Sequence, residues 1–236
     1  MKQYLARCAK VVVLSCAVLG TAVVQAQSRN LAPGFTHRLA NSTVVVVPAD
    51  MELFSISAGG VMEPKADWTA AAQKNFKTSL DGQSRMIGKT AAPLTEADMD
   101  AFAQINALHG AVAESVFLHH MMGSVLKLPT KNDQLDWSLG DAVKPLKDKT
   151  GADYALFFWV RDSYASAERK AAMVALALLG VGISGGTQVA YASLVDLRDG
   201  RVVWFNMLRR AGGDLREPAP AVETVESLLK GFPVLQ

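Results

Sequence analysis

The sequence contains very little cysteine, and none of it lies beyond residue 16. Its two cysteines are Cys8 and Cys16, both inside the segment 1–26, which has the features of an export signal. Once that segment is removed, the chain has no disulfide, no thiol nucleophile and no cysteine ligand for a metal. An exported protein without disulfides must fold on its hydrophobic core alone. Removal of 26 from 236 residues leaves 210, which is enough for one such domain.

The segment 1–26 matches a secretory signal peptide. Three basic residues precede an apolar run over 11–24, and "VQA" at 24–26 places small residues at the −3 and −1 positions of a cut before Gln27. A membrane anchor needs roughly 20 apolar residues, so the length of this run argues against an uncleaved anchor. We therefore expect export to the bacterial periplasm.

A lipoprotein signal is the alternative for the same segment. The stretch "VLSC" at 13–16 is a loose lipobox, which would attach the protein to the outer membrane through Cys16. This alternative leaves only five apolar residues before the cysteine and more apolar sequence after it. We therefore rank it below cleavage before Gln27.

The mature chain has no excess of positive charge. The full sequence has 24 Lys and Arg against 22 Asp and Glu, and Lys2, Arg7 and Lys10 leave with the signal, so 21 basic residues face 22 acidic ones. A nucleic-acid-binding protein shows a clustered basic face. We therefore expect no nucleic-acid partner.

Hydrophobic patterning predicts a single α/β domain over 43–236, preceded by an irregular, polar segment over 27–42. Valine-rich and alternating stretches predict strands, and stretches with a helical period predict helices. We expect strands over 42–57 (ended or turned into an edge by Pro48), 84–88, 152–162, 187–197 and 202–208, and helices over 68–80, 95–126, 138–149, 167–180 and 222–231.

Polar residues mark where the helices begin. Asp67 and Ser166 are expected caps, and Thr95 with Asp98 forms a capping box. Asp199-Gly200 is a hairpin signal between the last two strands. The predicted order, β-α-β-α-α-β-α-β-β-α, gives a mixed central sheet that has a C-terminal antiparallel hairpin and helices packed on it.

The stretch "LLGVGISGG" at 178–186 matches two catalytic or cofactor patterns, G-x-G-x-x-G and G-x-S-x-G. Both motifs need a strand before them and a helix after them, whereas here a helix composition precedes and strand alternation follows. The hydrolase arrangement also needs a later histidine, and none follows His120. We expect this stretch to end a helix and turn the chain into a strand, and a serine hydrolase using Ser184 is the least favoured hypothesis.

Other polar residues give no predicted catalytic, cofactor or metal site. His119 and His120 are neighbours, so on a helix they point about 100° apart and do not converge. The pair Arg209-Arg210 ends the last strand, where an anion or a partner could bind, although a solvated strand end is the simpler interpretation. Four carboxylates sit at or near strand ends, where active sites often collect but where turn chemistry is also common: Asp50, Asp153, Asp162 and Asp196.

The segment 171–183 contains no charged residue. A helix that is apolar all round is buried in a core, in a partner or in lipid, and this one is too short to span a bilayer. Core burial is the default expectation, and the alternative is an interface or a membrane contact. The residues of that candidate contact are Met173, Val174, Leu176, Leu178, Leu179, Val181 and Ile183.

Two motifs give the chain a family resemblance. "GADY" at 151–154 opens the central strand, and "LVD" at 194–196, Asp199-Gly200 and Val203-Trp204 form the hairpin. In these features the chain resembles the fold group of the curli-secretion channel protein and of the amino-terminal domain of the Tol–Pal translocation protein. The resemblance covers most of 43–210 and implies an envelope accessory or assembly role, often oligomeric and without catalysis. The secretion branch inserts membrane β-hairpins where this chain has a short apolar helix.

The sequence therefore favours a non-enzymatic exported protein that associates with envelope proteins or with itself and needs no cofactor. Peripheral membrane contact through 171–183 is an open alternative for that segment. The runner-up is a periplasmic module that binds a small molecule or a lipid on the helix-lined face of the sheet.

Overall fold

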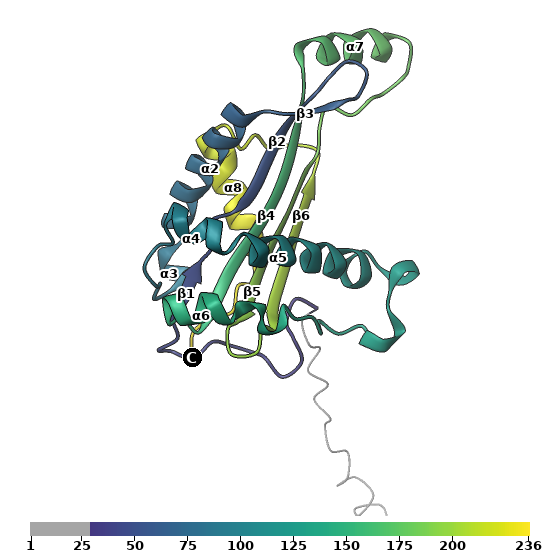
Figure 1. The fold of residues 1–236 in the computed structure, drawn as a ribbon. Coiled ribbons are helices and arrows are strands. Elements are labelled where there is room, and N and C mark those ends of the chain that lie inside the picture. The colour runs from purple at the N-terminus through teal and green to yellow at the C-terminus, as the bar shows by residue number, and fades with distance from the viewer. Residues whose placement is uncertain (1–28) are drawn as a thin grey trace, which may run out of the picture.

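The computed structural model describes residues 29–236, and the predicted signal peptide and its Cys16 alternative lie outside them. A single α/β domain is built on one mixed sheet, as predicted, and in the described residues this sheet has six strands where five were expected (Figure 1). The strands are β1 (Val44–Val46), β2 (Asp50–Ile56), β3 (Met62–Pro64), β4 (Tyr154–Ala165), β5 (Gln188–Asp196) and β6 (Val202–Arg210).

Strand β4 is the centre of the sheet, as its apolar and aromatic sequence predicted. The strand order is β3-β2-β4-β5-β6, with β1 also paired to β4. Strands β1 and β2 run parallel to β4, and β5 and β6 follow as the predicted antiparallel hairpin. A strand covered on both faces needs apolar residues throughout, which explains why β4 is almost entirely buried.

The valine-rich stretch forms two short strands in place of one. Val44 to Val46 pair with the first residues of β4, and Asp50 to Ile56 pair with its second half. The break lies at Pro48, which cannot donate to a ladder. The two strands therefore follow one another along the same side of β4.

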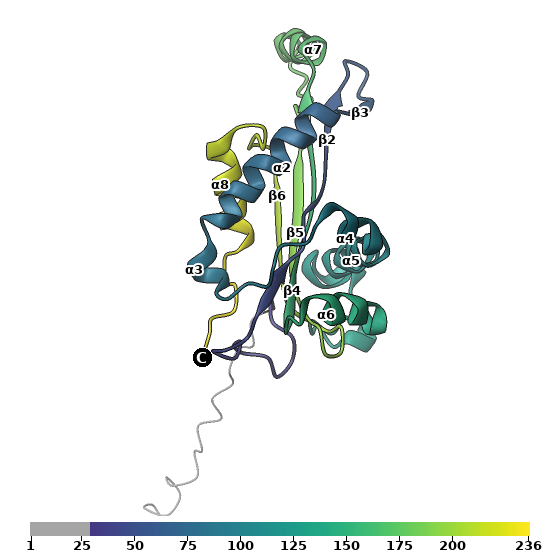
Figure 2. The ribbon, with the colours of Figure 1, turned by 60° about the vertical axis from the view of Figure 1, so that its left-hand side comes forward.

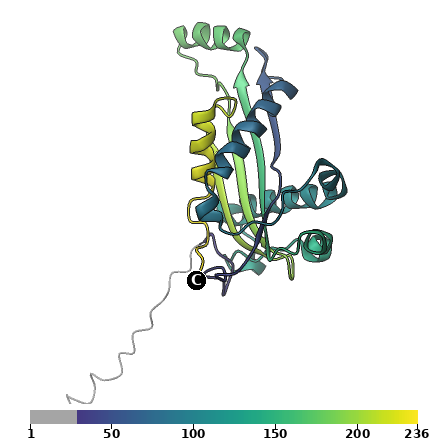
Figure 3. The ribbon, with the colours of Figure 1, turned by 90° about the vertical axis from the view of Figure 1, so that its left-hand side faces the viewer.

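Helices cover both faces of the sheet (Figures 2 and 3). Helices α2 (Ala66–Asp81), α3 (Ser84–Ile87) and α8 (Pro218–Leu228) lie on one face, and α4 (Glu96–Ala101), α5 (Ala103–Val116) and α6 (Lys144–Thr150) lie on the other. One core cluster includes Phe76, Phe158 and Trp204, and the opposite one includes Val116, Phe157 and Phe205. Phe157 and Phe158 are neighbours on β4, and their side chains point to opposite faces of the sheet, so each belongs to a different core cluster.

The capping box at Thr95 is confirmed, but the long helix that it opens is divided. The Thr95 side chain accepts from the Asp98 backbone N–H, and Asp98 accepts from the Thr95 N–H. The chain then breaks at Phe102 between α4 and α5, and α5 continues into a π-helical turn, η1 (Phe117–Met121). Three short 3-10 turns follow before α6: η2 (Ser124–Leu126), η3 (Pro129–Lys131) and η4 (Gly140–Val143).

Several local predictions are wrong. Asp67 lies inside the first turn of α2, whose cap position is Lys65, so its carboxylate is near the positive helix end without capping it. Residues 84–88, expected as a strand, form α3 instead. The last helix, expected over 222–231, is α8 over Pro218–Leu228. It begins earlier than expected because proline is well tolerated in the first turn of a helix.

Residues 29–42 wrap the end of the sheet through isolated bridges to Trp204 and Leu235. Arg38 in this segment is fully buried, and its guanidinium donates to the carbonyls of Pro233 at 2.9 Å, Ile87 at 2.6 Å and Met86 at 3.0 Å. Burial lowers the pKa of this arginine. One cation therefore joins the N-terminal segment, α3 and the C-terminal end.

Candidate functional site

Helix α7 (Ala167–Leu178) projects beyond one end of the sheet, opposite the C-terminal end of the chain (Figure 1). The Ser166 hydroxyl accepts from the Arg169 N–H at 3.1 Å, which confirms the predicted cap. Alanine and leucine, both strong helix formers, supply most of the helix. Gly180 follows with a φ of 77°, a conformation that glycine adopts without strain, and this ends the helix.

The expected core burial of 171–183 is wrong, because α7 has no buried residue. Val174, Leu178 and Leu179 are 66%, 84% and 77% exposed. This exposure agrees with the position of the helix, which stands past the end of the sheet (Figure 1). Of the seven candidate residues, Val174, Leu178, Leu179 and Val181 are exposed, and Met173, Leu176 and Ile183 are partly buried.

Two contacts hold the base of α7 in place. The Arg169 side chain donates from Nε to the Ser184 carbonyl at 2.9 Å and from Nη1 to the Ser57 carbonyl at 3.3 Å. Gly186 then passes so close to β4 that an added Cβ would lie 1.9 Å from the Ser163 carbonyl oxygen. Glycine is therefore required where the return segment joins the sheet.

The hairpin between β2 and β3 lies at the same end of the sheet as α7 (Figures 1 and 2). The Ser57 carbonyl at this turn accepts from Arg169, so the two excursions are in contact. Val61 and Met62 on the hairpin are also exposed. We define the apical surface as the exposed apolar side chains of both excursions: Val61, Met62, Val174, Leu178, Leu179 and Val181.

The glycine-rich stretch 178–186 links a helix to a strand, in the reverse order of both motifs that it imitates. The Ser184 hydroxyl donates to the Gly186 carbonyl at 3.1 Å. Its surroundings are thus those of a turn, in agreement with the structural interpretation of this stretch.

Three histidines, His109, His119 and His120, have hydrogen-bond partners other than Ser184. His109 is fully buried, stacks on Phe157 and contacts the Ser193 hydroxyl through Nε2 at 2.9 Å. Burial lowers its pKa to about 3, so its ring is neutral near pH 7. His119 and His120 contact backbone carbonyls of Leu126 and Arg29 respectively. Among residues 29–236 no three His, Cys, Asp or Glu side chains are grouped as metal ligands.

Asp162 is the one of the four strand-end carboxylates with an unusual environment. It is buried, and it accepts from the Tyr164 hydroxyl, from Gln188 Nε2 at 2.6 Å and from the Ser163 N–H at 2.9 Å. Burial raises its pKa to about 6, although these hydrogen bonds lower it. Tyr164 also accepts from the Leu215 N–H, so the network fastens the segment before α8 to the sheet.

The other three carboxylates have ordinary partners. Asp50 pairs with Arg161 at 2.8 Å, Asp153 accepts from the Thr43 N–H at 2.8 Å, and Asp196 pairs with Arg198 at 2.5 Å. The structure does not bring these groups to one site, because each interacts with its own local partner.

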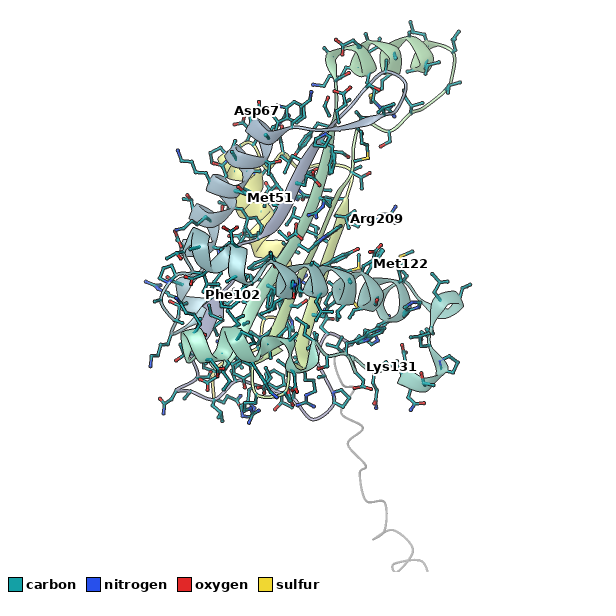
Figure 4. The ribbon with its side chains drawn as sticks, in the orientation of Figure 1. Met51, Asp67, Phe102, Met122, Lys131 and Arg209 are labelled. Carbon is teal, nitrogen blue, oxygen red and sulfur yellow. The ribbon has the colours of Figure 1, made fainter. Side chains whose placement is uncertain are left out.

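Arg209 and Arg210 at the end of β6 have different surroundings. The Arg209 side chain is exposed (Figure 4), whereas Arg210 donates to Gln188 and Thr224. Sequence inspection missed the network around Asp162, since Gln188 and Leu215 lie far from Asp162 along the chain.

Within residues 29–236 no helix is both long and apolar enough to cross a membrane. A comparison with family models finds no match. A comparison with curated proteins finds none either.

Solved structures do show likenesses. The chain is similar to the lipoprotein GNA1162 of Neisseria meningitidis, at 15% identity over 81% of this chain and 98% of that one, with a TM-score of 0.34. It is similar to PelC of Paraburkholderia phytofirmans, solved as a dodecamer, at 14% identity over 87% and 95%, with a TM-score of 0.36. The C-terminal domain of LpoB from Salmonella enterica is 11% identical over 76% and 87%, with a TM-score of 0.30. Likenesses at this level carry no inference about function.

Proposed function

We propose that this chain is a non-catalytic accessory or assembly protein of the bacterial envelope, which associates with other proteins, its own copies included, through the apical surface. The observation that carries the proposal is the exposure of Val174, Leu178 and Leu179 on a helix without charge after its first turn. Exposed apolar side chains are stabilised when a partner removes them from water, and large patches of them mark interaction sites.

The rest of the chain supports the same role. The export signal pattern over 1–26 supports a location outside the cytoplasm, and the 151–154 and 194–204 motifs resemble those of the curli-secretion and Tol–Pal group. Those resemblances also imply association without catalysis. Two buried titratable side chains have partners within the fold: His109 contacts the Ser193 hydroxyl through Nε2, and Asp162 accepts from Gln188.

The position of the apical surface suits docking. Arg169 and the close approach of Gly186 to β4 fix the base of α7, so the exposed side chains are presented at a defined place. Presenting a preorganised surface reduces the entropy that association must overcome.

The test is a pair of charge substitutions on exposed side chains. Leu178→Glu with Leu179→Glu should abolish association while leaving the domain folded, because both residues are exposed in the isolated chain. Val125→Glu is the matched control, since Val125 is 93% exposed and lies outside the apical surface.

Size-exclusion chromatography of envelope extracts measures whether each variant is part of a complex. The wild type and Val125→Glu should elute in a complex larger than the purified monomer, and the double variant should elute as the monomer. A wild-type chain that elutes only as a monomer in the extract, with or without detergent, would contradict the proposal. Loss of the large species in detergent, together with flotation on phospholipid vesicles, would assign the surface to lipid.

A further inference from the structure

A second candidate surface lies on the outer edge of the sheet, along β1 and β2. The chain itself covers this edge at both ends. The Val44 N–H donates to the Lys89 carbonyl and its carbonyl accepts from the Ala91 N–H, both at 2.9 Å. Farther along, the Leu53 carbonyl accepts from the Lys65 N–H, next to the pairing of β2 with β3.

Between these covered ends the edge is open. Backbone groups alternate in direction along a strand, so Val46 points outward like Val44, and Met51 points outward like Leu53. No residue of the described part of the chain hydrogen-bonds these outward groups of Val46 or Met51. The break at Pro48 lies between them. An unpaired sheet edge is a template for another extended chain.

An apolar groove lies in front of this gap. Its volume is about 460 Å³, and it is lined by Val46 to Ala49, by Phe76 and Leu80 of α2, and by the segment 90–94. Met51, which lies on β2 near α2, is shown in Figure 4. Val46 lines the groove, so its unpaired backbone groups and the apolar walls occur at the same place, and Met51 follows on the far side of the break at Pro48.

The charges around the groove indicate which occupant fits. A fatty acid or phospholipid carries an anionic head group and needs a cation that is free to bind it. Lys77 is the basic residue of the lining, and it already pairs with Asp81 of the same lining at 3.2 Å. An uncharged peptide backbone matches this neutral rim. Its own N–H and C=O groups can serve as the hydrogen-bond partners that the outward backbone groups of Val46 and Met51 lack.

We propose that this groove binds an extended, apolar segment of a partner polypeptide, added as a strand to the outer edge of β1 and β2. Residues 89–91 already form such an addition beside β1, and the partner segment extends that line across the break. Main-chain hydrogen bonds then supply affinity, and the groove selects apolar side chains. This surface is independent of the apical surface, which lies at the end of the sheet.

The probe is a display library of eight-residue peptides randomised among Val, Ile, Leu, Thr, Ser, Phe, Tyr and Lys, selected against the mature chain. Enriched peptides should bind the wild type and lose affinity for Ala92→Trp, which fills the groove from an exposed position of its lining. Ala103→Trp, on the exposed surface of α5, is the control and should bind like the wild type. Methylation of alternate peptide nitrogens should weaken binding about tenfold or more, because it removes the main-chain bonds.

Amide resonances locate the bound peptide. The N–H signals of Val46 and Met51 should shift and become protected from exchange when the best peptide binds. Absence of enriched peptides, equal binding by Ala92→Trp, or insensitivity to methylation would overturn the proposal. Displacement of the peptide by laurate, with laurate alone shifting the same signals more strongly, would also overturn it in favour of a lipid.

Discussion

The Arg169 guanidinium donates from Nε to the Ser184 carbonyl at 2.9 Å, which joins the first turn of α7 to the segment that returns to β5. Arg169 also reaches Ser57 in the neighbouring hairpin. A single side chain therefore ties together the two excursions that carry the apical surface.

We expect Arg169→Ala to loosen α7 without unfolding the domain. Hydrogen exchange over 171–183 should accelerate, because the helix loses its connection to the return segment. The free energy of unfolding should change by less than about 1 kcal/mol, since α7 contributes no buried residue. Lys170→Ala, at the next and exposed position, is the control and should leave exchange unchanged. Equal exchange in both variants would show that Arg169 does not fix the helix.

The buried carboxyl of Asp162 should make stability depend on pH. Its pKa is raised by burial to about 6 in the fold, so the folded state holds the proton more tightly than the unfolded chain. The stabilisation is complete below the unfolded pKa of about 3.9 and is lost as the pH rises through about 6.

Asp162→Asn removes that titration. From pH 4 to pH 8 the variant should gain on the order of 2–3 kcal/mol of unfolding free energy relative to the wild type. Urea unfolding of both proteins across this range measures the difference. Asp141→Asn, at an exposed position, should track the wild type. A constant difference between Asp162→Asn and the wild type would contradict the raised pKa.

Arg38 should be irreplaceable even by lysine. Its guanidinium donates to three carbonyls from three different nitrogens, whereas a lysine has a single ammonium nitrogen that cannot reproduce this planar arrangement. Arg38→Lys should destabilise the domain by about 2 kcal/mol or more, because buried carbonyls lose their partner. Thermal unfolding measures the loss, and Arg85→Lys on the exposed side of α3 should be neutral. Equal melting temperatures for the two variants would refute the role of Arg38.

The export prediction concerns the segment 1–26. Cleavage before Gln27 should give a mature protein whose N-terminal peptide begins at that glutamine in mass spectrometry. Cys16→Ser should leave cleavage and location unchanged. A mature chain that begins at Cys16 and carries acyl groups would instead establish the lipoprotein alternative.

The strands of the centre could be predicted from the sequence because their own side chains determine them. The apolar run of β4 and the Asp199-Gly200 turn between β5 and β6 carry local signals that the fold keeps. Strand β3 carries no such signal. It has only three residues, all of them exposed, and one of them is Pro64, which is uncommon in strands. The composition of residues 84–88 favours a strand, whereas the chain there forms one helical turn beside α2.

The site was harder to predict, because composition does not tell a buried apolar helix from an exposed one. The segment 171–183 has the composition of a core helix, and only the structure shows that the sheet ends before it. Likewise Asp162 has an ordinary sequence context, and its partners Gln188 and Leu215 reach it only through sheet pairing and the course of the chain before α8.

Photo-crosslinking in cells from a probe at Leu178 tests the central claim most directly, with Val125 as the control position because both side chains are exposed. The account predicts a defined protein adduct, to the chain itself or to another envelope protein, from Leu178 and none from Val125. A Leu178 probe that yields no protein adduct, or only lipid adducts, would contradict the assignment of the apical surface to protein association.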